Sequence, residues 1–261
     1  MTVAVKLPIF GVGVNPTTYA EATLAIIEAA CKHQSIGVTA LATHGLMTAV
    51  REPDFRRVVE ELDIVTPDGQ PVRWALNRFH GVGLTDRVYG PQLTLEVCAE
   101  AERRGLSVFL FGSTEATVHL LEHELRRRYP NLVVAGVQPD RFREATPEED
   151  EADVARINAS GASVVLVGRG CPRQEYWVWA HRRKLSAALL AVGAAFDYIA
   201  GTLPTPPPWM QAHGLEWLYR VAKDPRRLWR RYLQYNLLFL AYFVWELARR
   251  GLPARQAKAS C

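Results

Sequence analysis

An aspartate in a turn is the side chain best placed for acid–base chemistry in this sequence. Asp68 stands in Thr66-Pro67-Asp68-Gly69, directly after a run of β-forming residues. Its carboxylate is therefore expected at the end of a strand, where it could deprotonate a substrate hydroxyl. With a pKa near the reference value of about 4, it is expected to be ionised at neutral pH. The alternative is structural, because Pro-Asp-Gly is a favoured turn sequence in which Asp bonds its own backbone.

A turn of small residues could bind an anion. Gly112-Ser113-Thr114 lies between a predicted strand and a predicted helix, where backbone amides and the positive end of the helix attract phosphate. Ser and Thr also cap helices without any ligand, and that alternative stays open. Gly168-Arg169-Gly170 and the other glycine pairs lack the third glycine of the dinucleotide fingerprint, and the chain has no P-loop. We therefore expect no NAD, no ATP and no other cofactor.

Metal-binding patterns are weak. His119-Leu120-Leu121-Glu122-His123 matches a zinc pattern with two histidines one helical turn apart. The buried stripe of that helix is expected to run through Val118, Leu121 and Leu125, which leaves both histidines on its polar side. The sequence has no Asp-x-Asp to hold a divalent ion beneath a nucleotide diphosphate. We expect no metal site. If the substrate is a nucleotide diphosphate, the charge on its leaving diphosphate would then be met by arginines and amide donors.

The composition is that of a folded protein with its basic residues concentrated late. The 261 residues are 49% apolar and 22% charged, which excludes a wholly disordered chain and fits one large domain with a small appendage. Residues 220–231 hold six basic residues and one acid. We expect this segment to bind anions, in particular a membrane surface and not nucleic acid. Four scattered cysteines and a poor signal-peptide pattern indicate the cytoplasm.

Short β-rich runs alternate with longer helical stretches. This pattern is typical of an α/β fold with a mainly parallel, Rossmann-like sheet and helices on both faces. Ligands bind beyond the carboxyl ends of the strands in such sheets. Strands are predicted at 37–41, 63–66, 108–111, 133–136, 164–167 and 189–192, and helices at 18–32, 54–61, 92–104, 115–129 and 148–159. The loops expected to meet at one site are 43–45, 67–69, 112–114, 168–175 and 193–197.

Composition changes near residue 203. Leu203-Pro204-Thr205-Pro206-Pro207-Pro208 is a stiff hinge, so we predict an α/β core at 1–203 and a helical appendage at 204–261. The apolar run 237–245 is far shorter than the roughly 20 residues that span a bilayer. An interfacial helix on the membrane fits its aromatics, and packing against the core or a second subunit is the alternative. The aromatics expected at the headgroups are Trp229, Tyr232, Tyr235, Tyr242 and Trp245.

Between about residues 51 and 236 the chain resembles the WecG/TagA/CpsF glycosyltransferases, also called glycosyltransferase family twenty-six. The resemblance lies in the order and spacing of several motifs. They are Pro67-Asp68-Gly69, Arg87-Val88-Tyr89-Gly90-Pro91, Pro172-Arg173-Gln174-Glu175, Val192-Gly193-Ala194-Ala195-Phe196-Asp197, Gly214-Leu215-Glu216-Trp217-Leu218-Tyr219-Arg220 and Asp224-Pro225-Arg226-Arg227-Leu228-Trp229-Arg230-Arg231-Tyr232.

The resemblance implies inverting, metal-independent transfer from a UDP-sugar, often an N-acetylmannosamine donor, to a polyprenyl-diphosphate-linked sugar. Such enzymes build bacterial surface or exopolysaccharide at the inner face of the cell membrane. The resemblance places the general base at Asp68 and the donor pocket at Gln174 and Asp197. It implies that basic residues of the appendage reach the diphosphate, the alternative being a solvated basic helix or lipid contact. These residues are Arg220, Arg227, Arg230 and Arg231.

For three residues, Arg173, Thr43 and His44, the sequence leaves more than one role open. Gly168 and Arg173 are both expected to bind substrate, and Arg173 could equally form a structural ion pair with Glu175. Many family members carry Thr-x-Asn near the first strand, but this chain has Ala40-Leu41-Ala42 before Thr43-His44-Gly45. We expect Thr43 or His44 to contact the sugar instead, and a structural role for His44 is the alternative.

Two other functions fit parts of the sequence. The α/β pattern alone permits an NAD-dependent nucleotide-sugar epimerase or dehydrogenase. The aromatic and basic tail alone permits a non-catalytic membrane scaffold. A homo-oligomer is compatible with either function and with the glycosyltransferase.

Overall fold

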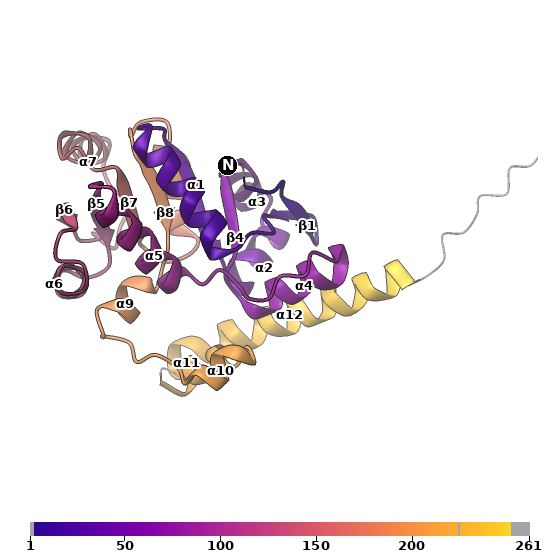
Figure 1. Ribbon diagram of the computed structural model, residues 1–261. Coiled ribbons are helices and arrows are strands. Elements are labelled where there is room, and N and C mark those ends of the chain that lie inside the picture. Colours follow the sequence, from indigo (N-terminus) through magenta and orange to yellow (C-terminus); the bar gives the residue numbers. More distant parts are fainter. Residues whose placement is uncertain (1–2, 224, 252–261) are drawn as a thin grey trace, which may run out of the picture.

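The fold is built on a parallel sheet, as predicted. The computed structural model describes residues 3–223 and 225–251, and the side chains of Arg227 and Arg231 lie outside that description. The six-stranded sheet has the order β4-β3-β8-β7-β5-β6 (Figure 1). Its strands are β3 (Ile36–Leu41), β4 (Ile64–Pro67), β5 (Ser107–Gly112), β6 (Val133–Gln138), β7 (Val164–Gly168) and β8 (Ala188–Ala191). They correspond to the six predicted strands, with ends that differ by at most two residues.

Helices cover both faces of this sheet because its strands are apolar on both sides. In β5, Val108 and Leu110 belong to one apolar cluster, whereas Phe109 and Phe111 belong to the other, which is the period of two of an extended chain. The first cluster is completed by α1 (Tyr19–Cys31), α5 (Gly90–Arg103), α6 (Glu115–Arg128) and α9 (Ala195–Ile199). The second is completed by α2 (Thr43–Arg51), α3 (Pro53–Glu61), α4 (Gln70–His80), α7 (Pro147–Ala159) and α8 (Arg173–His181).

Local signals explain which helices could be predicted. At α7, Thr146 Oγ1 accepts from the Glu149 N–H at 3.3 Å, and the Glu149 carboxylate accepts from the Thr146 N–H at 3.0 Å, so the predicted cap is confirmed. Residues 43–45, 173–175 and 195–197 were expected as loops, but they begin α2, α8 and α9. Those expectations were wrong because helix starts without a side-chain cap leave no local mark.

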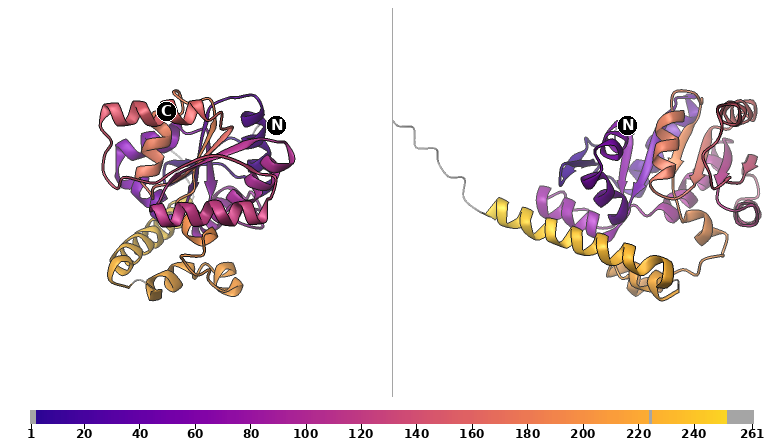
Figure 2. Two further views of the ribbon diagram at one scale, coloured as in Figure 1. Left: turned by 90° about the vertical axis from the view of Figure 1, so that its left-hand side faces the viewer. Right: turned by 180° about the vertical axis from the view of Figure 1, so that it is seen from behind.

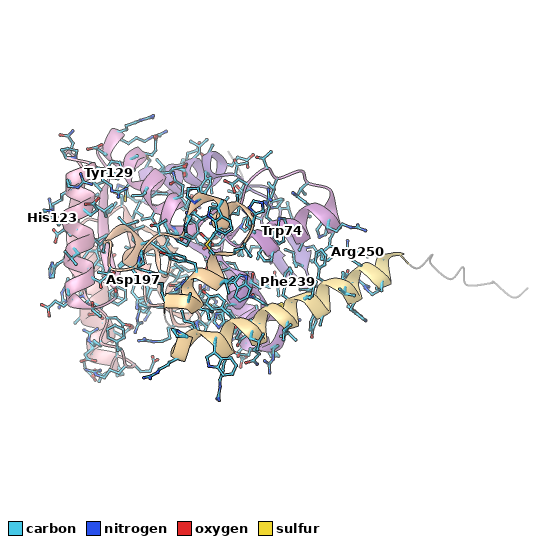
Figure 3. The ribbon with its side chains drawn as sticks, turned by 90° about the horizontal axis from the view of Figure 1, so that it is seen from below. Trp74, His123, Tyr129, Asp197, Phe239 and Arg250 are labelled. Carbon is cyan, nitrogen blue, oxygen red and sulfur yellow. The ribbon has the colours of Figure 1, made fainter. Side chains whose placement is uncertain are left out.

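The C-terminal segment consists of α10 (Pro208–Ala212), α11 (Glu216–Lys223) and α12 (Pro225–Gly251). The long α12 lies across the lower side of the molecule, past α2 and α4 to the hairpin of β1 (Leu7–Ile9) and β2 (Val12–Val14) (Figures 1 and 2). Its inner face packs on the core: the rings of Phe239 and Tyr242 each lie 5.5 Å from that of Phe10. Arg250 near its end donates to the Phe79 carbonyl at 2.6 Å. Figure 3 shows Phe239 and Arg250 along this helix.

Two of the aromatic side chains of α12 do not lie where the sequence predicted them. Tyr235 and Tyr242, expected at membrane headgroups, pack against the core instead, because apolar neighbours on α2 and the hairpin face that side of the helix. The outward face carries exposed apolar side chains, and none of the described helices is both long and apolar enough to cross a bilayer. The exposed apolar side chains of α12 are Trp229, Leu233, Leu237, Leu240, Val244 and Trp245.

Candidate active site

A cavity of about 670 Å³ lies beyond the carboxyl ends of the strands. The sheet contributes Thr43, Asp68, Ser113, Gly168 and Gly193, one from each of the five loops expected to meet there. The facing wall comes from α11 and the first turns of α12. That wall includes Glu216, Trp217, Arg220, Leu228, Tyr232 and Tyr235. A ligand in this cavity would therefore be held between the sheet and the C-terminal segment.

Asp68 follows β4 directly and lines this cavity, half-buried. Its Oδ2 accepts a hydrogen bond from the N–H of Gly90 at 3.3 Å, in a different loop from its own turn. Glycine favours this close approach, because a Cβ at position 90 would lie 3.1 Å from the Val192 carbonyl oxygen and 3.4 Å from Asp68 Oδ2. The carboxylate is thus oriented by a tertiary contact and lines the cavity.

Burial changes the acid–base behaviour of Asp68. Removal from water raises its pKa to about 7, against the lowering influence of Arg87 and the Gly90 N–H. The expectation of a pKa near 4 was wrong, since the sequence does not reveal how much water the folded chain excludes. A carboxyl group with a pKa close to neutrality can both take up and release a proton at physiological pH, as general acid–base catalysis requires.

An ion pair beside Asp68 joins the core to the C-terminal segment. Arg87 Nη2 donates to Glu216 Oε1 at 2.7 Å, and its Nη1 donates to Glu216 Oε2. The guanidinium also stacks 4.2 Å over the ring of Tyr89, whose ring contacts that of Tyr198 edge-on at 6.0 Å. Burial raises the pKa of Tyr198 to about 12, so its hydroxyl stays protonated. The sequence prediction missed Arg87, Glu216, Tyr89 and Tyr198 as members of the site, although the first three stand in the quoted motifs and Tyr198 directly follows one of them.

A buried polar network shapes the floor of the cavity. Gln174 Nε2 and Thr39 Oγ1 both donate to Glu175 Oε1, at 2.9 and 3.0 Å, while Gln174 Oε1 accepts from the Gly170 N–H at 3.1 Å. Burial raises the pKa of Glu175. Gln174 lines the cavity, and the network fixes its amide in one orientation. Its role in binding the donor stays a prediction.

Arg173 is engaged elsewhere. It pairs with Asp140 at 3.1 Å, and the same carboxylate accepts from Arg169 Nε at 3.1 Å. The hypothesis of an Arg173–Glu175 ion pair was therefore wrong: the two side chains leave α8 on different sides, and Glu175 points into the core. Arg173 is absent from the described lining of the cavity, whereas Arg169 belongs to it.

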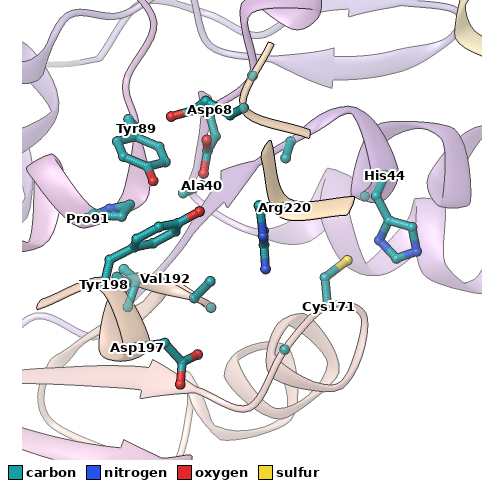
Figure 4. A pocket seen from close by; sticks show the side chains of 18 of the residues that line it. Ala40, His44, Asp68, Tyr89, Pro91, Cys171, Val192, Asp197, Tyr198 and Arg220 are labelled. Carbon is teal, nitrogen blue, oxygen red and sulfur yellow. The ribbon is translucent and has the colours of Figure 1, made fainter. Parts of the chain in front are cut away.

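Arg220 and Lys223 of α11 are the described basic residues of the appendage that line the cavity, and Arg220 is the more buried of the two. Its guanidinium lies 5.9 Å from the ring of Tyr198, and its Nε is buried without a hydrogen-bond partner among the described residues. Figure 4 shows Arg220 in the middle of the cavity, with Asp68, Tyr89 and Tyr198 to one side and His44 to the other. Asp197 lies at the rim of the cavity across from Asp68. A buried donor in need of an acceptor makes this the natural position for an anionic group of a ligand.

The other basic residues of the appendage are placed differently. Arg230 stacks over the ring of Trp229 at 5.3 Å, and both residues are exposed on α12. Arg230 is absent from the described lining of the cavity. The predictions for Arg227 and Arg231 fall on side chains outside the described part, and their role in binding a diphosphate stays a prediction.

The Gly112-Ser113-Thr114 turn is occupied by protein contacts. Thr114 Oγ1 accepts from the Thr117 N–H at 3.2 Å, which confirms the capping alternative for α6. The Ser113 N–H donates to the Gly168 carbonyl at 2.9 Å, so it is not available to a phosphate. A Cβ at Gly112 would lie 2.6 Å from Gly168. The glycine is needed where β5 and β7 pair closely. Ser113 and Thr114 nevertheless line the cavity, and phosphate binding at this turn stays a prediction.

Thr43 and His44 begin α2 at the side of the cavity. The His44 ring lies edge-on to Tyr235 of α12, with 4.5 Å between the centroids. The His119–His123 pattern lies on α6, where both histidines are exposed and His119 Nδ1 is 3.5 Å from Glu122. No group of three or more His, Cys, Asp or Glu side chains in the described residues is placed to hold a metal ion.

Most of the chain matches a known protein family. The model of the Glycosyl transferase WecG/TagA/CpsF family matches residues 7–252. The match spans the sheet, the cavity and α12, so it covers every described element that lines the site. The chain belongs to the WecG/TagA/CpsF family of glycosyl transferases.

Proposed function

We propose that this glycosyltransferase moves a hexose or N-acetylhexosamine from a UDP-sugar to a polyprenyl-diphosphate-linked acceptor, with inversion at the anomeric carbon. The observation that carries the proposal is the pairing, across one cavity, of a near-neutral carboxyl group with a buried cation. Asp68 has a pKa of about 7, and Arg220 presents a buried Nε that lacks a partner in the described chain. The first suits a general base and the second suits a phosphate ligand.

The reaction is a direct displacement. Asp68 takes the proton from an acceptor hydroxyl, whose oxygen forms a bond to the anomeric carbon of the donor sugar. The bond from that carbon to the β-phosphate oxygen breaks, and UDP leaves with the electron pair. Arg220 stabilises the negative charge that develops on the diphosphate. Because attack and departure occur on opposite faces of the sugar, the product has the inverted configuration.

An exposed aromatic ring at the cavity rim is suited to stack on the uracil base. Phe142 lines the cavity and is 62% exposed, with a φ of 55° that a residue other than glycine seldom adopts. Its loop is held in place on both sides. Arg141 and Arg143 pair with carboxylates of α7, and Asp140 pairs with Arg169. Such rigid placement of an exposed ring supports a binding role.

The outward face of α12 is proposed to dock on an anionic membrane. Leu233, Leu237, Leu240 and Val244 follow one another at intervals of three and four residues and are each about half exposed, which gives a continuous apolar stripe. Arginines flank it near both ends of the helix and would be attracted to acidic headgroups. Since α11 and α12 form one wall of the cavity, this position would bring a lipid-linked acceptor to the reacting groups.

Release of UDP tests the proposed function. A panel of UDP-sugars is incubated with short-chain polyprenyl-diphosphate sugars, and the anomeric configuration of any product is assigned by NMR. We expect UDP release that depends on one donor and one acceptor. Arg220→Ala is expected to weaken UDP binding about tenfold or more, because it removes a charge-assisted hydrogen bond. Arg103→Ala, an exposed arginine of α5, is the matched control. A wild-type protein that binds no UDP in calorimetry contradicts the proposal.

A further inference from the structure

A second cavity adjoins the first. It has a volume of about 810 Å³ and lies between the start of α5, the loop before it, and residues 199–212. The two cavities share a wall made of Gln70, Arg87, Tyr89, Pro91 and Tyr198. Asp68 lies next to this wall, because it accepts from Gly90 between two of the shared residues. Figure 4 shows three residues of this wall, Tyr89, Pro91 and Tyr198, on one side of the first cavity, with Asp68 beside Tyr89. A group in the second cavity can therefore approach Asp68 from that side.

Two buried polar atoms of α4 at this cavity lack a partner. Gln70 is 5% exposed, and its Oε1 has no hydrogen bond within the described chain. Arg73 Nε is in the same situation, although its Nη1 donates to the Leu84 carbonyl at 3.3 Å. Both side chains line the second cavity. An acceptor and a donor left unpaired together cost stability, and a hydroxyl-bearing ligand supplies both partners at once.

The charges around the cavity favour a neutral ligand. Arg87 is paired with Glu216, and Arg128 is paired with Glu124 at 2.7 Å. One further arginine, Arg73, lines the cavity together with two acids, Asp86 and Glu96, so the lining offers no excess positive charge to an anionic ligand. Aromatic rings of Tyr19, Tyr89 and Tyr198 provide apolar surface between these polar groups. Apolar surface with a few convergent polar groups is the usual composition of a small-molecule site, and here it matches a sugar ring and its hydroxyls.

We propose that the second cavity binds the saccharide of the acceptor while the donor occupies the first cavity. The reacting hydroxyl of this saccharide then lies at the shared wall, next to Asp68. This assignment rests on the proposed function and adds to it the place of the acceptor. Donor and acceptor then lie on opposite sides of the anomeric carbon, as direct displacement requires. Gln70 and Arg73 are the residues that select the acceptor, through the hydroxyls that pair with their buried atoms.

Blocking the second cavity tests the assignment. Thr85 is exposed and lines the second cavity but not the first, so Thr85→Trp fills the space without disturbing the core. Gln70→Leu removes the unpaired acceptor atom. Both variants are expected to raise the KM for the short-chain polyprenyl-diphosphate sugar at least tenfold. In Thr85→Trp, which lies outside the first cavity, the Kd for UDP and the slow release of UDP without acceptor should stay within a factor of two. Glu151→Trp, on the exposed side of α7, is the control for adding a surface tryptophan.

The outcomes separate this assignment from the proposed function. Unchanged acceptor KM in Thr85→Trp overturns the assignment, and so does a loss of UDP affinity equal to the loss of acceptor affinity. Absence of UDP binding by the wild-type protein would instead remove the proposed function. Saturation-transfer NMR with free hexoses and N-acetylhexosamines gives a readout without turnover: the signal should appear with UDP-bound wild-type protein and disappear in Thr85→Trp.

Discussion

Glu216 of α11 and Arg87 of the core form a two-bond ion pair next to Asp68. The side chains are 14% and 6% exposed, so the pair is held away from water. Arg87 lowers the pKa of Asp68 and Glu216 raises it. The C-terminal segment therefore influences the pKa of the proposed catalytic carboxyl group through the charge of Glu216, which it places beside Arg87.

Replacement of Glu216 by Gln should shift the pH dependence of the reaction. The change removes the negative charge that raises the pKa of Asp68 and releases Arg87, which lowers it. We expect the acidic limb of the profile of kcat/KM against pH to move to lower pH. Glu216→Asp retains the charge and serves as the control. A uniform loss of activity at every pH, with an unmoved limb, would show that Glu216 only holds α11 in place.

The wild-type enzyme should lose activity as the pH falls through about 7. A general base acts in its deprotonated form, and the pKa of Asp68 is about 7, so kcat/KM should rise about tenfold per pH unit below that value and level off above it. The profile is measured with a saturating donor and a dilute acceptor. A limb near pH 4 would mean that water enters the site freely and that burial does not control this carboxyl group.

Substitution of Asp68 by Asn should separate activity from stability. Turnover is expected to fall by about 10²–10⁴-fold, while UDP affinity stays near the wild-type value. Because the folded-state pKa is raised from 3.8 to about 7, the free energy of unfolding of the wild type declines as the pH rises through that window. Asp68→Asn should therefore have a higher Tm than the wild type at pH 8, and the difference should shrink at pH 4.

The control for Asp68→Asn is Asp54→Asn, an exposed carboxylate in the first turn of α3. It should leave both turnover and the pH dependence of Tm unchanged. Full turnover in Asp68→Asn would remove the carboxyl group from the mechanism.

The sequence predicted the sheet well because its signal is local. Runs such as 108–111 and 164–167 are apolar on both faces, which is typical of buried parallel strands, and the α7 cap is contained within four residues. The helix α4 was missed although Val72, Leu76 and Phe79 have helical spacing, because Asp68-Gly69 was interpreted as part of a loop. The prediction of the loops that surround the cavity followed from the fold class, which fixes where the strands end.

The contacts that set the chemistry could not be predicted in the same way. Arg87 and Glu216 are 129 residues apart, and nothing local marks them as partners. Asp140 pairs with Arg169 and Arg173 across the crossover that contains α7, so Arg173 was assigned the wrong partner. The pKa of Asp68 depends on the water that α11 and α12 exclude, which is a property of the packed molecule.

Removal of the Phe142 ring should weaken nucleotide binding. Stacking of a base on an aromatic side chain contributes about 1–3 kcal/mol, so Phe142→Ala should raise the Kd for UDP by about 5- to 150-fold. Phe142→Tyr keeps a ring of the same shape and is expected to bind normally. Calorimetry with UDP measures both. Equal affinity of the alanine variant for UDP would place the base elsewhere in the cavity.

Charges on the outward face of α12 should release the protein from membranes. Leu237→Glu with Leu240→Glu places two carboxylates in the exposed apolar stripe, at side chains that are 57% and 55% exposed. Loss of apolar contact and repulsion by acidic headgroups act in the same direction. Cosedimentation with vesicles of phosphatidylglycerol should fall severalfold relative to the wild type, and UDP affinity should stay unchanged because neither residue lines the cavity.

The matched control introduces the same two charges away from the C-terminal segment. Leu120→Glu with Val133→Glu alters apolar side chains of similar exposure, 47% and 52%, on α6 and β6, and it should leave vesicle binding intact. Light scattering tests the alternative that a second copy of the chain covers the apolar stripe. A wild-type dimer that becomes a monomer in Leu237→Glu with Leu240→Glu, while vesicle binding persists, would assign this face to a second copy of the chain. Vesicle binding that weakens as the salt concentration rises would show that the arginines contribute to it, since salt screens exposed charges but does not weaken apolar burial.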